Sequence, residues 1–177
     1  MRVRRYAVAV LVSAFCVVAC SSIPPPLPIG ATPAPYSFTG SLTLSGEIPL
    51  QGGFSDNVTL RHETCEQYVR AAAPATTLWV VPTPNNTQSI DGHVVMYTAG
   101  VPNIAPSIGF RGPRSYGGVS AIMSVLIVDN ASFVPGDSAT TTITVSGDGS
   151  GSMSFEGLVD TASNAAESGR VQWTCTD

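Results

Sequence analysis

The clearest pattern in this chain is an alternation of residue types from Tyr36 to Gln51. Every even position from 36 to 50 carries an aromatic residue, an aliphatic residue or glycine, and every odd position from 37 to 51 carries Ser, Thr, Glu, Pro or Gln. A period of two places these two sets on opposite faces of a β-strand. The run is long for one strand, and Gly40 and Gly46 allow a bulge or bend. The pattern therefore predicts a long, bent first strand.

Shorter apolar or alternating runs predict the remaining strands, and turn residues separate them. The strands are expected at residues 58–62, 78–81, 92–98, 108–110, 121–128, 140–146, 152–159 and 169–176. Turns are expected at 52–53, 129–130 and 135–136. The run at 121–128 is almost continuously apolar, which predicts a central strand covered on both faces.

The glycine-rich segment 147–151 is predicted to be the turn of a β-hairpin. Inward positions follow from the alternation on either side of this turn and in the last strand; they are Ile143, Val145, Met153, Phe155, Val171, Trp173 and Cys175. Glycine-rich loops also cradle phosphates, but those loops lead into a helix, whereas here a β-type sequence follows. The segment therefore predicts a turn and no phosphate site.

One helix is predicted near residue 64. Thr64 and Gln67 have the spacing of a capping box, in which the two side chains bond backbone groups at a helix start. Glu66 and Arg70 are spaced for an i,i+4 ion pair, and Pro74 ends the pattern. With roughly eight or nine strands, the chain is expected to be mainly β, an antiparallel sandwich or small barrel with one short helix.

Two cysteines lie within the β region, Cys65 and Cys175. In an exported protein they are expected to form one disulfide, with two unpaired buried thiols as the alternative. Cys16 lies in the N-terminal segment and does not enter this count.

The first 19 residues have the features of an export signal. Arg2, Arg4 and Arg5 precede an apolar run, and Val17, Ala19 and Cys20 satisfy the requirements of a lipoprotein signal peptidase. This lipobox resembles the bacterial lipoprotein signal. The resemblance implies cleavage before Cys20, a thioether-linked diacylglycerol on Cys20 and often an acyl chain such as palmitate on its amino group. The alternatives are a retained membrane helix, for which the run is shorter than the roughly 20 residues needed, and an ordinary secretory signal.

Residues 20–35 follow as a tether and residues 36–177 as a single β domain. The tether contains six prolines and no charged residue, which favours an extended polyproline-type segment. Removing residues 1–19 takes away three arginines and none of the twelve acidic residues, so the mature chain has a formal charge of −7 and no lysine. This charge argues against nucleic-acid partners. We expect attachment to the extracytoplasmic face of the cell membrane through lipid on Cys20.

A search for catalytic and metal-binding patterns finds no strong candidate. His62-Glu63 lacks a second histidine four residues on, and His93 with Glu63, Glu66 or Asp91 would form a metal site only if the fold brought them together. No Gly-x-Ser-x-Gly motif is present for a nucleophilic serine. We therefore predict no cofactor, no metal and no catalytic residues.

One local cluster of basic residues is a candidate binding site. Arg111 and Arg114 flank Gly112-Pro113, and Tyr116 follows two residues later. Guanidinium groups bind phosphates and carboxylates, so the cluster is a candidate for gripping an anionic headgroup or partner. An ordinary solvated loop is the alternative.

The lipobox, the proline-rich tether, the Thr/Gly-rich β domain and the closing Trp173-Thr174-Cys175 are together similar to small mycobacterial and other actinobacterial cell-envelope lipoproteins, including the 19-kilodalton lipoprotein antigen group. The first hypothesis is a non-enzymatic, lipid-anchored surface protein whose β domain recognises an envelope protein or host molecule, because no catalytic pattern is found and a long tether presents the domain outward. A carrier of a lipid or glycolipid is the second hypothesis, because the apolar stripe from Tyr36 to Leu50 is long. An envelope hydrolase is the third, and it requires His62, His93, Glu156 or Asp160 to converge in a cleft.

Overall fold

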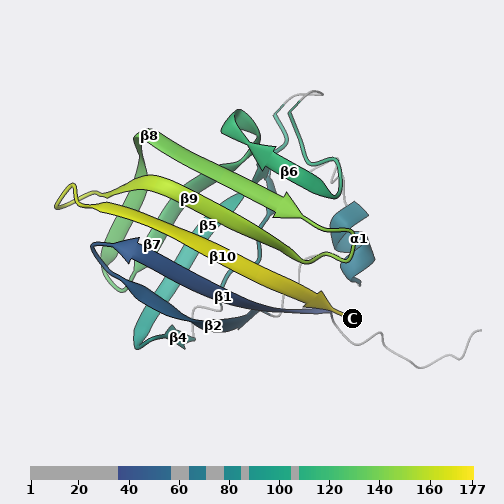
Figure 1. Ribbon diagram of the computed structural model, residues 1–177, viewed down its shortest axis with the longest axis horizontal. Coiled ribbons are helices and arrows are strands. Elements are labelled where there is room, and N and C mark those ends of the chain that lie inside the picture. Colours follow the sequence, from purple (N-terminus) through teal and green to yellow (C-terminus); the bar gives the residue numbers. More distant parts are fainter. Residues whose placement is uncertain (1–35, 57–63, 71–77, 85–87, 105–107) are drawn as a thin grey trace, which may run out of the picture. The chain divides into compact units, whose positions relative to one another are not determined.

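The computed structural model describes residues 36–56, 64–70, 78–84, 88–104 and 108–177, all of which belong to the unit Pro33–Asp177. They form a curled antiparallel sheet, or half-barrel, with one short helix (Figure 1). This confirms the predicted fold class. The strands are β1 Ser37–Gly46, β2 Leu50–Asp56, β3 Leu78–Val80, β4 Ser89–Ile90, β5 His93–Pro102, β6 Arg114–Gly117, β7 Ile122–Val128, β8 Ala131–Val145, β9 Gly151–Asp160 and β10 Ala166–Thr176; the helices are α1 Cys65–Arg70 and a 3₁₀ turn, η1, at Gly118–Ser120.

The long strand β8 carries the sheet from one layer to the other. The strand order is β2-β1-β10-β9-β8-β7-β5-β3, while β4 pairs with β5 and β6 pairs with β8. Residues 131–133 of β8 pair with β7, and residues 142–145 pair with β6. Between these two parts the register against β9 shifts from Pro135 to Thr140, which lets the strand bend. In Figure 1, β5 and β7 therefore lie behind β8, β9, β10 and β1.

The predicted long first strand is wrong, because the chain reverses after Gly46 and returns as β2. The two strands form a hairpin in which Leu44 lies opposite Leu50. Gly46 has a φ of 149°, and a methyl group there would lie 2.3 Å from the carbonyl oxygen of Ala166. Five residues separate Leu44 from Leu50, so both side chains remain on the inner face. The alternation of residue types therefore continues through the turn and does not reveal it.

Two predicted turns and one predicted strand are also wrong. Gly52-Gly53 lies inside β2, where a methyl group on Gly52 would come within 2.8 Å of the Ile90 side chain. Pro135-Gly136 lies inside β8 at the register shift. At 108–110 the structure has an isolated bridge, and the strand of this region is β6, Arg114–Gly117, which is only four residues long.

The strand β7 lies between β5 and β8, as expected of a central strand. One face carries the buried residues Met123, Leu126 and Val128, but the other carries the exposed Ser124. The predicted cover on both faces is therefore wrong for that second face. The turn at Asp129-Asn130 and the hairpin between β8 and β9 are confirmed.

Large side chains fill the inner face of the curled sheet. The predicted inward residues Ile143, Val145, Met153, Phe155, Val171 and Trp173 are all at most 3% exposed, and Cys175 is half-buried beside them. They belong to one core that also includes the aromatic residues of β1, β3 and α1. A continuous core of this kind is what holds a domain of this size together.

Glycines make room for Trp173 in this core. A cross-strand row places Gly40 of β1 on one side of Trp173 and Gly151 of β9 on the other, and Phe54 of β2 lies beyond Gly40. A methyl group on Gly151 would lie 2.3 Å from the indole ring, and one on Gly40 would lie 2.4 Å from the Phe54 ring. The indole N–H donates to the carbonyl oxygen of Gly149 at 2.8 Å. Large and small residues therefore alternate across the strands.

Side chains, rather than a strand pairing, connect the β2 edge to Thr83 and Gln88. The Gln88 amide accepts from the Ser55 N–H at 3.0 Å and donates to the Ser55 hydroxyl at 2.6 Å. The Asp56 carboxylate accepts from the Thr83 N–H at 3.2 Å. These bonds satisfy groups of the edge strand that would otherwise be open for pairing.

Two replacements of Asp56 should distinguish the effect of its charge on stability from the effect of its hydrogen bond. Burial raises the pKa of the Asp56 carboxyl, and the bond from Thr83 opposes this less strongly. A raised folded pKa means that the stability gained by protonation is complete below the unfolded pKa and is lost as the pH rises through the folded pKa. Asp56→Asn keeps an acceptor for Thr83, so its stability at neutral pH should equal or exceed that of the wild type. Asp56→Ala should be less stable than both.

Urea unfolding at a series of pH values measures this effect. In Asp56→Asn the decline in stability across the titration of this carboxyl should disappear. Identical pH profiles for the wild type and Asp56→Asn would contradict the assignment.

The helix α1 begins as the sequence predicts. The Thr64 hydroxyl accepts from the Gln67 N–H at 3.1 Å, and Arg70 pairs with Glu66 at 2.5 Å on the exposed face. The predicted disulfide is confirmed, with Cys65 in α1 and Cys175 in β10 and a Cα–Cα distance of 5.9 Å. It attaches the helix to the last strand of the sheet.

Several predictions concern residues outside the described ranges. These are the strand at 58–62, the signal at 1–19, the lipidated Cys20 and the tether at 20–35. Within the described residues, no helix is both long enough and apolar enough to cross a membrane.

Candidate functional site

The segment from Arg111 to Arg114, here called the arginine loop, is held by the hydroxyl of Tyr116. Tyr116 is buried in β6, and its Oη accepts from the Arg111 N–H at 2.9 Å and donates to the Gly112 carbonyl at 2.6 Å. Gly112 has a φ of 82°, which favours glycine at this position. The Tyr116 hydroxyl therefore positions the loop and is already engaged on both sides.

Stacked aromatic rings support this loop from below. Tyr116 stacks on Phe110 with centroids 5.5 Å apart, and Phe110 stacks on Trp79 at 4.2 Å with nearly parallel planes. Trp79 in turn contacts Tyr68 of α1 at 4.9 Å, and its indole N–H donates to the Tyr68 carbonyl at 3.2 Å. Aromatic pairs of this kind add to the energy of burial, so the loop rests on a rigid base.

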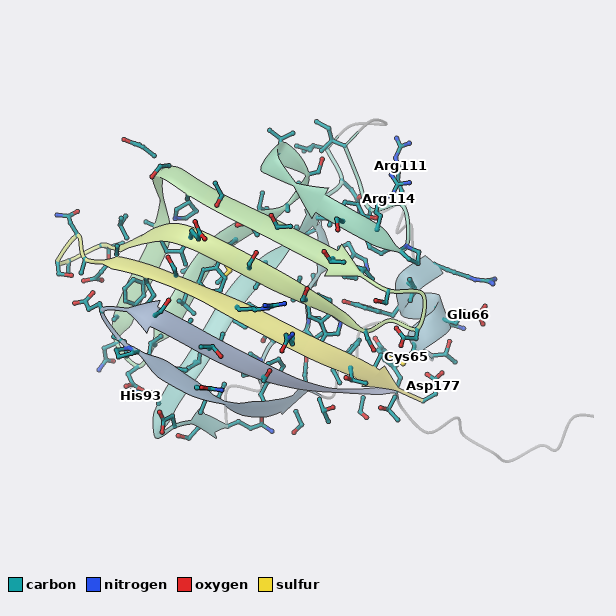
Figure 2. The ribbon with its side chains drawn as sticks, in the orientation of Figure 1. Cys65, Glu66, His93, Arg111, Arg114 and Asp177 are labelled. Carbon is teal, nitrogen blue, oxygen red and sulfur yellow. A yellow bond between two sulfur atoms is a disulfide. The ribbon has the colours of Figure 1, made fainter. Side chains whose placement is uncertain are left out.

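The structure brings the three sequence candidates together in one pocket. This arginine pocket has a volume of about 330 Å³ and is lined by Arg111, Arg114, Ser115, Tyr116 and Ser120 with two glycines. Both arginine side chains are exposed, and Figure 2 shows them at the same end of the domain. The lining contains no acidic residue. The pocket is therefore lined by two guanidinium groups and by hydroxyl groups.

The positive charge of the pocket affects the pKa of the Tyr116 phenol. Burial raises the pKa of the Tyr116 phenol, while the bond from the Arg111 N–H and the positive charges of Arg114 and Arg111 lower it. Both guanidinium groups therefore lie close enough to act on the phenol. Paired guanidinium groups bind phosphate or carboxylate through charge-assisted hydrogen bonds. The arrangement is suited to holding an anion.

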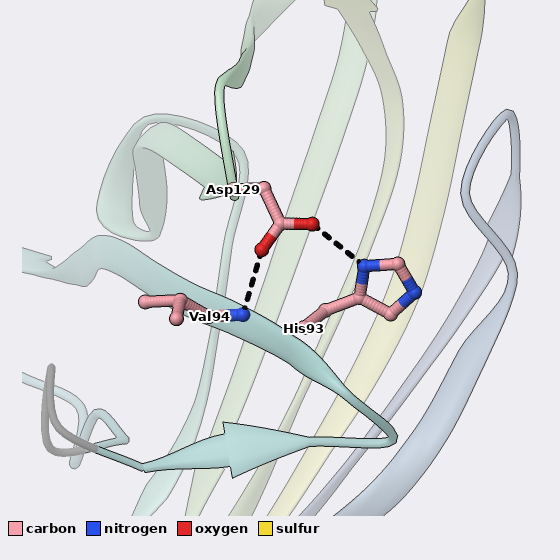
Figure 3. Close-up of polar contacts among 3 residues, drawn as sticks. All are labelled: His93, Val94 and Asp129. Carbon is pink, nitrogen blue, oxygen red and sulfur yellow. Dashed lines mark hydrogen bonds and ion pairs between the residues drawn. The ribbon is translucent and has the colours of Figure 1, made fainter.

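His93 forms a second polar cluster, which joins two turns of the sheet (Figure 3). Its Nδ1 lies 2.8 Å from Oδ2 of Asp129, and Oδ1 of Asp129 accepts from the Val94 N–H at 2.9 Å. The bond with His93, followed by the bond from Val94, lowers the pKa of the Asp129 carboxyl. Sequence analysis missed this pair because 36 residues separate its members. The pair fastens the β4–β5 turn to the β7–β8 turn.

The other candidate acids do not converge. Glu66 pairs with Arg70, and Asp91 lies in the β4–β5 turn. Glu156 is exposed on β9, whereas Asp160 is buried and accepts from the N–H and hydroxyl of Ser163. In the described ranges, no three His, Cys, Asp or Glu residues are grouped as metal ligands. His62 and Glu63 lie outside those ranges.

A second, larger hollow lies on the outer face of the sheet and was not predicted. It has a volume of about 620 Å³ across β1, β10, β9 and β8, and its polar side chains include Thr39, Ser41, Thr144, Ser152, Gln172 and Thr174. None of its lining residues is charged. The related pattern in the sequence is the run of Ser and Thr at odd positions of the first strand. That run indicates an outward face, but it does not indicate a hollow.

Comparison of the chain with protein-family models, with curated proteins and with solved structures found no match.

Proposed function

We propose that this protein is a lipid-anchored lipoprotein of the cell envelope, whose β domain recognises an anionic group without catalysing a reaction. The observation that carries the proposal is the arginine pocket, in which Arg111 and Arg114 are presented together on a loop fixed by Tyr116. A loop fixed in advance binds with less loss of conformational entropy than a mobile one. The anionic group is a phosphate or carboxylate carried by an envelope component or a host molecule.

The proposed location outside the cytoplasm has two sources of support. The first is the lipobox, Val17 to Cys20, with the basic and apolar segment before it. The second is the Cys65–Cys175 disulfide, because such bonds persist in exported proteins and are rare in a reducing cytosol. Several acyl chains on Cys20 would give lasting attachment to the membrane surface.

The packing of the domain favours recognition over carriage of a lipid. In the apolar stripe that suggested a carrier, Tyr36, Phe38, Leu42, Leu44 and Leu50 are each at most 4% exposed, and Ile48 is half-buried against the same core. Lipid carriers instead line a cavity with such side chains. The separate positions of His93, Glu156 and Asp160 likewise give no support to a hydrolase.

Titration with inorganic phosphate tests the proposal. Arg114→Gln should weaken phosphate binding about tenfold or more, because a charge-assisted hydrogen bond contributes about 1.5–3 kcal/mol. Arg170→Gln is the matched control, since Arg170 is exposed on β10 and does not line the pocket. Isothermal titration calorimetry measures both. Equal phosphate affinities of the wild type and Arg114→Gln would refute the proposed site.

A further inference from the structure

Two strongly exposed apolar side chains accompany the arginine pocket. Val119 and Ile104 are each 71% exposed. Val119 lies in η1, directly before the pocket residue Ser120. The Ile104 N–H donates to the carbonyl of Ile108, the residue before the pocket residue Gly109, at 3.2 Å. Exposed aliphatic side chains beside arginines are typical of surfaces that enter a membrane interface.

The first described residue, Tyr36, and the arginine loop adjoin the same helix. Tyr36, the first described residue, packs its ring against Tyr68 of α1 at a centroid distance of 6.4 Å. The same helix borders the arginine loop, because a methyl group on Gly112 would lie 3.9 Å from the carbonyl oxygen of Val69. Figure 1 shows α1 and β6 at one end of the domain. Tyr36 and the arginine loop therefore both adjoin α1.

Charge distinguishes the arginine loop from the rest of this end. Glu66 pairs with Arg70, Asp177 accepts from the Cys65 N–H at 2.6 Å, and Asp148 accepts from the Ser150 N–H, but none of these three acidic residues lines the arginine pocket. Figure 2 shows His93 at the far end of the sheet from Arg111 and Arg114. In the described residues, the arginine pocket with Val119 and Ile104 is thus a positive and apolar patch on an acidic protein.

We propose that this patch docks on the anionic phospholipid headgroups of the membrane that holds Cys20; this inference rests on the proposed function of the arginine pocket. Arg111 and Arg114 bind headgroup phosphates, and Val119 and Ile104 enter the interface beside them. A weak contact suffices, because the lipid anchor keeps the domain at a high effective concentration near the surface. Docking places β6 and η1 on the membrane and leaves the opposite end of the sheet facing outward.

Vesicle binding tests the inference. The test protein is residues 20–177 with Cys20→Ser, since every described strand pairing and the disulfide lie within residues 36–177. It should sediment with vesicles of phosphatidylglycerol and phosphatidylcholine and not with phosphatidylcholine alone. Arg114→Gln should reduce this binding about fivefold. Val119→Ser should reduce it about threefold while leaving the affinity for inorganic phosphate unchanged.

Matched controls separate this inference from the proposed function. Arg170→Gln and Val94→Ser change exposed residues outside the pocket and should bind vesicles as the wild type does. Phosphate binding without binding to anionic vesicles would overturn membrane docking and leave the recognition site intact. If the test protein bound neither phosphate nor anionic vesicles, the recognition site would be overturned as well. Unchanged vesicle binding by Arg114→Gln or by Val119→Ser would also overturn the docking proposal.

Discussion

Replacing both Cys65 and Cys175 with alanine should lower the free energy of unfolding by about 2–5 kcal/mol. The disulfide joins residues 110 positions apart, so removing it releases most of the domain in the unfolded state. In the folded state it holds α1 against β10, and α1 carries Tyr68, on which Trp79 and the stacked rings below the arginine loop rest. Urea unfolding followed by circular dichroism measures the change.

Reduction of the wild-type protein provides the control for this variant. The reduced protein should unfold at nearly the same urea concentration as the double variant, because both lack the crosslink. A double variant as stable as the oxidised wild type would show that the disulfide contributes nothing to stability.

Gly151→Ala should destabilise the domain by about 1–3 kcal/mol, the usual cost of overfilling a packed core. The added methyl group would lie 2.3 Å from the Trp173 ring and 2.4 Å from the carbonyl oxygen of Thr144. Trp173 has little freedom to move away, because its indole N–H is bonded to Gly149 and its other side faces Gly40. Thermal unfolding and the tryptophan fluorescence spectrum report the effect.

Gly147→Ala is the matched control in the same hairpin. A methyl group on Gly147 would meet no atom within 4 Å, so this variant should be nearly as stable as the wild type. Equal losses of stability in the two variants would point to a general effect of glycine replacement and would contradict the packing of Trp173 between glycines.

The sequence predicts an element well where the residues that determine it are close together in the chain or few in number. The hairpin of β8 and β9 followed from alternating inward residues on either side of the 147–151 turn, and α1 followed from the spacing of Thr64, Gln67, Glu66 and Arg70. The disulfide followed from two cysteines in a chain with an export signal. In each case the residues that determine the structure are close in sequence or few in number.

The errors of prediction arise where distant residues decide the structure. The turn after Gly46 depends on contact with Ala166, and the placing of Gly52 inside β2 depends on Ile90. The turn predicted at Pro135-Gly136 is a bend inside β8. The sequence of this segment does not distinguish such a bend from a chain reversal, because the difference lies in the pairing of β8 with β9. A period of two establishes which side chains face inward but does not establish where the chain changes direction.

The same division applies to the candidate site. Arg111, Arg114 and Tyr116 are close together in the sequence, so the sequence alone was enough to select them as a cluster. The contribution of Ser120, the exposure of Val119 and the support by Trp79 all depend on packing between distant segments. Tyr116 was selected as part of a candidate binding cluster, and the structure shows that its hydroxyl is occupied in holding the loop.

The most direct test of the central claim is to map phosphate binding by NMR on the isotopically labelled test protein. Titration with inorganic phosphate should shift the backbone signals of residues 111–120 and the side-chain Nε signals of Arg111 and Arg114, and these shifts should be lost in Arg114→Gln. Shifts confined to the hydroxyl-lined hollow of β1, β10, β9 and β8, or no shifts at all, would contradict an anion site at the arginine pocket.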